Sequence, residues 1–176
     1  MTSAGPPDDE DRSGRLTHVD EHGKAHMVDV TGKVPSLRVA EARCSVRTSA
    51  DVARVLADPV NGADLLETAR FAGILAAKQT SHLIPLCHPI RVDGVAVDVQ
   101  QASDGFSVIA EAAIIDRTGV EMEALTACAA SALVLLQPLL EVDPLSSIEG
   151  LTLWRKTGGR SGPWQRSEDG EMLGGG

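Results

Sequence analysis

One uncharged stretch restricts the possible folds of this sequence more than any other feature. Residues Ala124 to Leu140 contain no charged side chain, and Thr126, Ser131 and Pro138 interrupt the apolar run. The stretch is slightly short for a membrane span, and a proline removes one helical hydrogen bond. We therefore expect a helix that is buried on more than one side of a folded domain, and no membrane association.

Hydrophobic periodicity and turn signals predict an alternating order of strands and helices around this stretch. Alternation of apolar and polar residues marks strands, and apolar residues three or four apart mark helices. A short helix at 49–57, capped by Ser49, follows the first strand. Without it the order is βαββαβ, an α+β fold of ferredoxin-like type with an antiparallel sheet and helices packed on one face. The strands are expected at 37–48, 91–101, 106–116 and 148–156, and the long helices at 64–80 and 121–140.

The first long helix is apolar on two sides. Leu65, Ala69 and Gly73 fall on one arc of a helical wheel, and Phe71 and Ile74 fall on the other. A single sheet covers only one side of a helix, so we predict a homo-oligomer in which the second side is buried between subunits. The alternative is a monomer with some exposed apolar side chains, which is common in soluble proteins.

Composition divides the chain into an arm, a domain and a tail. Residues 1–15 contain paired prolines and an acidic run and predict a disordered arm, 16–162 form the domain, and 163–176 end in a glycine-rich mobile tail. The net charge of -9 argues against a general nucleic-acid binder, which requires a basic surface. The first residues contain no apolar signal-peptide core, so we expect a cytoplasmic protein.

The three cysteines, Cys44, Cys87 and Cys128, are far apart and show no CxxC spacing. This pattern argues against a disulfide framework and against a zinc site. Buried, reduced thiols are the simplest interpretation.

A proline-stiffened loop at 83–89 ends in Cys87, His88 and Pro89. Pro89 favours an extended backbone at His88, and a histidine held in a rigid loop is suited to proton transfer near neutral pH. The alternative is a structural histidine bonded to a backbone group.

Two glutamates follow a predicted strand-to-helix turn at 116–119. Glu121 and Glu123 lie in the first turn of the long uncharged helix. Residues two apart point in nearly opposite directions on a helix, so both carboxylates can serve one site only if the segment is partly extended. The alternative is that they stabilise the positive end of the helix dipole.

Cations occur in two places that could hold phosphate. Lys78 lies at the end of the first long helix. It could bind phosphate or act as a base with a shifted pKa. The alternative is a lysine whose aliphatic stem covers apolar surface. Lys156 and Arg160 flank glycines after the last strand, where exposed N–H groups and cations can bind phosphate. The alternative for this segment is a flexible basic loop.

Four strings together resemble the cyclic pyranopterin monophosphate synthase family, between Leu16 and Gly162. They are LTHVDEHGKAHMVDVTGK, TARFAGILAAKQTSHLIPLCHP, RTGVEMEALTA and LWRKTGGRSG. The resemblance implies a ferredoxin-like fold and a hexamer of dimers with sites at subunit interfaces. It also implies the second step of molybdenum cofactor synthesis, in which a 3′,8-cyclised dihydro-GTP becomes a cyclic pyranopterin phosphate and releases pyrophosphate.

The resemblance also implies which residues form the site. No metal ligand set is evident in the sequence, although phosphate chemistry leaves room for Mg²⁺. The implied catalytic residues are Lys78, His88, Glu121 and Glu123, and the implied substrate-binding residues are Arg70, Cys87, Met122, Lys156 and Arg160.

Three charged residues of the family pattern are missing from this chain. The loop before the first long helix lacks the family's lysine, because no Lys or Arg occurs between Arg54 and Arg70. Gln137 and Leu140 stand where the pattern has an aspartate and a lysine. These departures leave two alternatives to a synthase: a repurposed paralogue acting on a related nucleotide, or a non-catalytic subunit that binds a nucleotide or pairs with an active paralogue.

Overall fold

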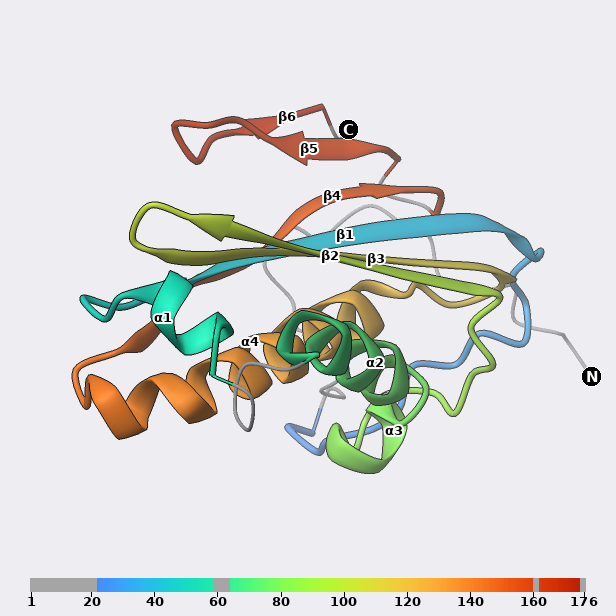
Figure 1. Ribbon diagram of the computed structural model, residues 1–176. Coiled ribbons are helices and arrows are strands. Elements are labelled where there is room, and N and C mark those ends of the chain that lie inside the picture. Colours follow the sequence, from blue (N-terminus) through green and yellow to red (C-terminus); the bar gives the residue numbers. More distant parts are fainter. Residues whose placement is uncertain (1–21, 59–63, 160–161, 175–176) are drawn as a thin grey trace, which may run out of the picture.

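An antiparallel sheet carries all the helices on one face (Figure 1). The computed structural model describes residues 22–58, 64–159 and 162–174. The predicted arm at 1–15 lies outside these residues. The α+β class and the one-sided packing of the helices are confirmed.

The sheet has the strand order β2-β3-β1-β4-β5-β6, and all neighbouring strands are antiparallel. The four predicted strands are present, with ends that differ from the prediction by a few residues. The strands are β1 (Ser36–Arg47), β2 (Gly94–Ala102), β3 (Gly105–Asp116), β4 (Ser147–Thr157), β5 (Trp164–Arg166) and β6 (Met172–Leu173).

Two of these strands lie where we expected a mobile tail. β5 pairs with β4, and β6 pairs with β5. The outer edge of β4 offers unpaired N–H and C=O groups, and an edge of this kind readily accepts another strand. Part of the segment at 163–176 therefore extends the sheet.

The helices are α1 (Val52–Leu56), α2 (Leu65–Ala77), α3 (Thr80–Leu83) and α4 (Glu121–Val142). The predicted cap at Ser49 is wrong: Asp51 accepts a hydrogen bond from the Arg54 amide, while Ser49 donates to Asp143. The long helix expected at 64–80 ends earlier, and α3 follows it as a separate turn. α4 continues past Pro138, because packing under the sheet outweighs the loss of one helical hydrogen bond.

Small side chains bring α2, α4 and the sheet into close contact. Ser131 on α4 donates a hydrogen bond of 2.8 Å to the carbonyl of Ala69 on α2. A Cβ atom at Gly73 would overlap the Ser131 hydroxyl and lie 2.9 Å from the carbonyl oxygen of Ala127. The core is rich in alanine, which suits a sequence with only 2% aromatic residues. It includes Ala40, Ala42, Cys44, Phe106, Val108, Ala110, Ala112, Ala124, Cys128, Ala132 and Leu135.

The helices also expose apolar side chains on the face away from the sheet. Phe71 and Leu75 of α2 are 72% and 56% exposed, and Leu133 and Leu140 of α4 are also exposed. α4 is long and apolar enough to cross a membrane. Length and composition alone are weak evidence for a span, and α4 packs against β1, β3 and β4.

Candidate functional site

The first turn of α4 and the end of β4 bring a carboxylate and an ammonium group together. Glu121 Oε1 lies 3.1 Å from Lys156 Nζ, and both side chains are partly buried. The carboxylate folds back over Gly119, where any Cβ atom would overlap it. Gly158 follows Lys156 closely and turns the chain with a φ of 79°, a conformation that favours glycine. The pair therefore depends on two glycine-containing turns.

Glu123 is the buried carboxyl group of this region, with only 4% of its surface exposed. Burial raises its pKa from 4.5 to about 7, a hydrogen bond to its own backbone lowers it, and the charge of Glu121 raises it further. A carboxyl group with a pKa near 7 can both give and accept a proton at neutral pH. The two glutamates therefore have different surroundings: Glu121 pairs with a cation, and Glu123 is nearly dry.

The loop after α3 places Cys87 and His88 beside the N-terminal segment and the start of α4. Burial and the negative charge of Glu123 raise the pKa of the Cys87 thiol. His88 Nε2 is 2.9 Å from the carbonyl oxygen of Val28. A carbonyl only accepts, so Nε2 carries the proton in this arrangement and Nδ1 is the nitrogen that can accept one.

The remaining predicted residues lie in other surroundings. Lys78 is exposed directly after α2, and Met122 is 37% exposed at the start of α4. Arg70 bonds to Glu67 and donates to the carbonyl of Val99 at 3.0 Å, so its side chain ties α2 to β2. Arg160 lies outside the described residues.

Arg38 is a neighbouring cation that sequence reasoning missed. It lines the same small hollow as Gly119, Glu121 and Lys156. Its Nε atom donates to the carbonyl of Asp116 at 2.9 Å. Arg38 lies opposite Ile114 in the ladder of β1 and β3, and only this cross-strand pairing brings it to the site.

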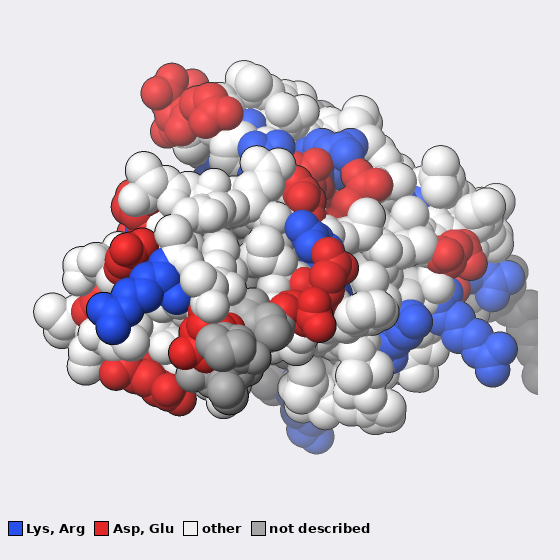
Figure 2. Space-filling model, in the orientation of Figure 1, with Lys and Arg blue, Asp and Glu red and all other residues white. Residues whose placement is uncertain are grey.

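The charged groups near the site include both signs. Figure 2 shows acidic and basic side chains interleaved over one face of the molecule, with no continuous basic field on that face. Among the described residues, no group of three or more His, Cys, Asp or Glu side chains could hold a metal ion. The site therefore offers carboxyl, imidazole and ammonium groups for proton transfer and phosphate binding.

Comparison with known proteins identifies the family. The MoaC family pattern matches residues 27–159. The chain belongs to the MoaC family. The match includes His88, Glu121, Glu123 and Lys156, and it covers all the main elements of the fold from β1 to β4.

Several MoaC relatives align over most of their length. A cyclic pyranopterin monophosphate synthase of Streptomyces avermitilis is 46% identical over 164 residues, which cover 93% of this chain and 94% of the relative. Cyclic pyranopterin monophosphate synthase 2 of Mycobacterium tuberculosis is 47% identical, covering 88% and 93%. The synthase of a Nocardioides species is 46% identical, covering 89% and 98%.

Proposed function

We propose that this chain is a cyclic pyranopterin monophosphate synthase of molybdenum cofactor biosynthesis. It converts 3′,8-cyclised dihydro-GTP into a cyclic pyranopterin phosphate and releases pyrophosphate. The observation that carries the proposal is the group at the start of α4, where buried Glu123 has a pKa of about 7 and Glu121 pairs with Lys156. The MoaC family match and the names of the relatives support the same reaction.

The site contains the chemical groups that this rearrangement requires. Ring opening and reclosure need groups that give and accept protons; the carboxyl group of Glu123, with a pKa of about 7, is one, and the imidazole of His88 is the other. The triphosphate needs positive charge, which Lys156, Arg38 and Lys78 supply. Glu121 neutralises Lys156 in the absence of substrate, so an incoming phosphate has to compete for this ammonium group. Mg²⁺ bound to the phosphates would also reduce the negative charge of the triphosphate.

The proposed assembly is a homohexamer built from dimers, in the cytoplasm, with sites completed by a second copy. Exposed apolar residues on α2 and α4, including Phe71 and Leu133, support contacts between copies. The hollow beside Lys156 is small on a single chain, and a partner subunit would complete the site. The strand order β2-β3-β1-β4 with two long helices on one face supports the ferredoxin-like topology.

The test is turnover of 3′,8-cyclised dihydro-GTP by the full chain, followed by pyranopterin formation and pyrophosphate release. His88→Ala is expected to lower kcat about 100-fold or more, the usual size of a lost general acid or base. His82→Ala is the matched control, because His82 is an exposed histidine of α3, and it should keep parental turnover. Repeating the assay with a chelator and with added Mg²⁺ tests the contribution of the cation.

Absence of turnover in a correctly assembled oligomer would contradict the proposal. That outcome would favour a repurposed paralogue or a subunit that needs a paralogue partner. Adding a catalytically active synthase of the same family separates these two, since only a partner-dependent subunit would gain activity on mixing.

A further inference from the structure

The pairing of β4 with β1 shifts register at two places, and the shift between Ala42 and Glu41 determines which face of the sheet Lys156 occupies relative to Leu153. Ala42 of β1 pairs with Leu153 and Glu41 pairs with Arg155, so Trp154 has no partner residue of its own. Such a bulge places two consecutive side chains on the same face of a sheet. Lys156 then lies opposite Ala40, whose side chain is in the core on the helix side.

Without the bulge, Lys156 would point away from the site. If Trp154 paired with Glu41, each later residue of β4 would shift by one position, and Lys156 would lie opposite Val39. A shift of one residue moves every side chain to the other face of a sheet. The ion pair with Glu121 on α4 would then be lost.

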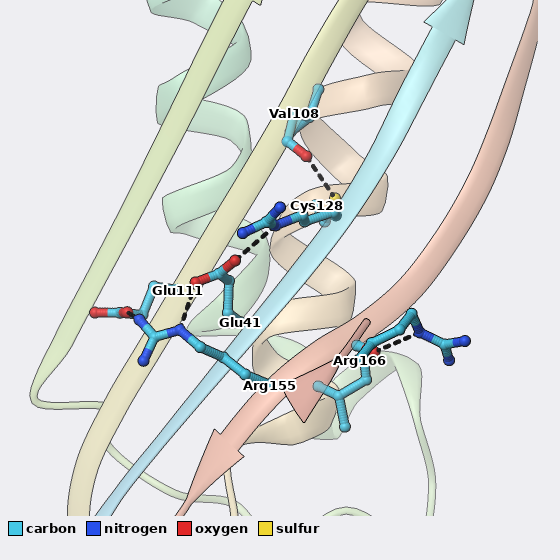
Figure 3. A network of polar contacts seen from close by, with 8 residues as sticks. Glu41, Val108, Glu111, Cys128, Arg155 and Arg166 are labelled. Carbon is cyan, nitrogen blue, oxygen red and sulfur yellow. Dashed lines mark hydrogen bonds and ion pairs between the residues drawn. The ribbon is translucent and has the colours of Figure 1, made fainter. Parts of the chain in front are cut away.

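The side chains of Trp154 and Arg155 both point away from the helices, and both have partners on that face of the sheet. Arg43 lies over the ring of Trp154, with 4.1 Å between its Cζ atom and the ring centroid. Arg155 donates to Glu41 Oε2 at 2.6 Å and also pairs with Glu111 of β3 (Figure 3). These contacts hold β4 to β1 and β3 at the position of the extra residue.

Glu41 is the centre of this group. It is 7% exposed, and its other oxygen, Oε1, accepts a hydrogen bond of 2.7 Å from Arg43. Burial alone would raise the pKa of Glu41, but the hydrogen bonds and charges of Arg155 and Arg43 outweigh burial and lower it. From β5, Arg166 donates to the carbonyl of Leu153 at 3.4 Å, which ties down the backbone just before the bulge (Figure 3).

We propose that Glu41 is a positioning residue, which together with Arg155 and Glu111 fixes the bulge at Trp154 and thereby holds Lys156 at the site. Glu41 touches neither the site nor the substrate in this proposal and acts only through the alignment of β4. Its effect on turnover rests on the proposed function, because that function gives Lys156 its role in binding phosphate. The effect of Glu41 on the position of Lys156 does not depend on the proposed function.

The first test is Glu41→Gln. Both carboxylate oxygens of Glu41 accept from arginines, and an amide keeps only one acceptor oxygen. KM for the cyclised dihydro-GTP should rise about tenfold, as expected for one lost charge-assisted hydrogen bond to phosphate, while kcat stays within about threefold. Asp104→Asn is the matched control, because it removes an ion pair with Arg47 at the far end of β1, and it should leave KM unchanged.

A rescue distinguishes positioning from general stabilisation. Deleting Trp154 from the Glu41→Gln variant removes the register shift next to Lys156, which still lies opposite Ala40, so the alternative alignment loses its advantage. The deletion should restore KM to within about threefold of the parent. A raised KM that the deletion does not restore would refute the positioning role. Arg155→Lys, which keeps the charge but loses the planar fork, is the second variant if Glu41→Gln fails to fold.

A second measurement is independent of turnover. The rate at which an N-hydroxysuccinimide ester acylates Lys156, read by mass spectrometry, should rise several-fold in Glu41→Gln and return to the parental rate after deletion of Trp154. An unchanged rate in a folded Glu41→Gln variant would overturn the inference. If the parent shows no turnover but these rates change as expected, the proposed function fails and the positioning role stands.

Discussion

Replacing Glu123 by glutamine should stabilise the fold and abolish the reaction at the same time. Glu123 is 4% exposed, and its pKa in the folded protein is about 7, compared with 4.5 for the unperturbed group. Because the folded state holds this proton more tightly than the unfolded state, the stability of the parent falls as pH rises from 4.5 to about 7. This loss of folding stability is complete at pH values above the pKa of the folded state, where it amounts to about 3 kcal/mol. Glutamine has a similar shape and does not titrate.

The effect is measured by urea unfolding of the parent and of Glu123→Gln across this pH range. The protein concentration is kept constant, because assembly makes the apparent stability depend on concentration. At about pH 8 the variant should be more stable by about 3 kcal/mol, and near pH 4.5 the two should agree closely. Turnover should fall about 100-fold or more. Glu121→Gln is the control, because its side chain is a third exposed and paired, and it should gain far less. A difference in stability that does not change with pH would refute the reasoning.

Three further predictions concern the packing, acid stability and assembly of the fold. Gly73→Ala should destabilise by about 1–3 kcal/mol in urea unfolding because its Cβ overlaps Ser131, and an unchanged midpoint would contradict this close helix contact. The pKa of Asp143 is lowered to about 2, chiefly by the hydrogen bond from the backbone of Ser49, so its contribution to stability is present above pH 3.8 and is lost as pH falls through about 2. Asp143→Asn should unfold at lower temperature at neutral pH and lose less stability on acidification, and parallel pH curves would contradict the assignment. Phe71→Ser should shift light-scattering mass towards smaller species, whereas an unchanged mass would place the subunit interface elsewhere.

The order of the main elements could be predicted because each has a clear period. β1 and β3 alternate, and the uncharged stretch has to be a core helix, so the α+β class followed from patterns within single segments. Contacts between segments distant in the sequence decided the details that were wrong. Ser49 was a reasonable cap by residue type, but the carboxylate of Asp143 accepts its hydrogen bonds. This partner is 94 residues away in the chain, so no local pattern reveals it.

The residues of the candidate site remain predictions, and their geometry could not be read from the sequence. His88, Glu121, Glu123 and Lys156 were singled out from short motifs, but their different surroundings depend on contacts between distant segments. Burial of Glu123 depends on how segments distant in the sequence pack around the start of α4, which no local pattern shows. The face of the sheet on which Lys156 lies depends on the register shift at Trp154, which the sequence does not reveal until the pairing of β4 with β1 is known.

Two of the positions at which the sequence differs from the expected family pattern lie on an exposed face of α4. Gln137 and Leu140 are exposed on α4, whereas Leu135 and Leu139 on the buried face of the same helix are fully covered. A change from charged to neutral residues on the exposed face alters the chemistry available there without disturbing the core. At the other end of α4, Glu123 is buried. Packing alone does not account for a buried carboxyl group whose ionisation lowers stability at neutral pH, so we expect Glu123 to be retained for proton transfer, which the turnover of Glu123→Gln tests.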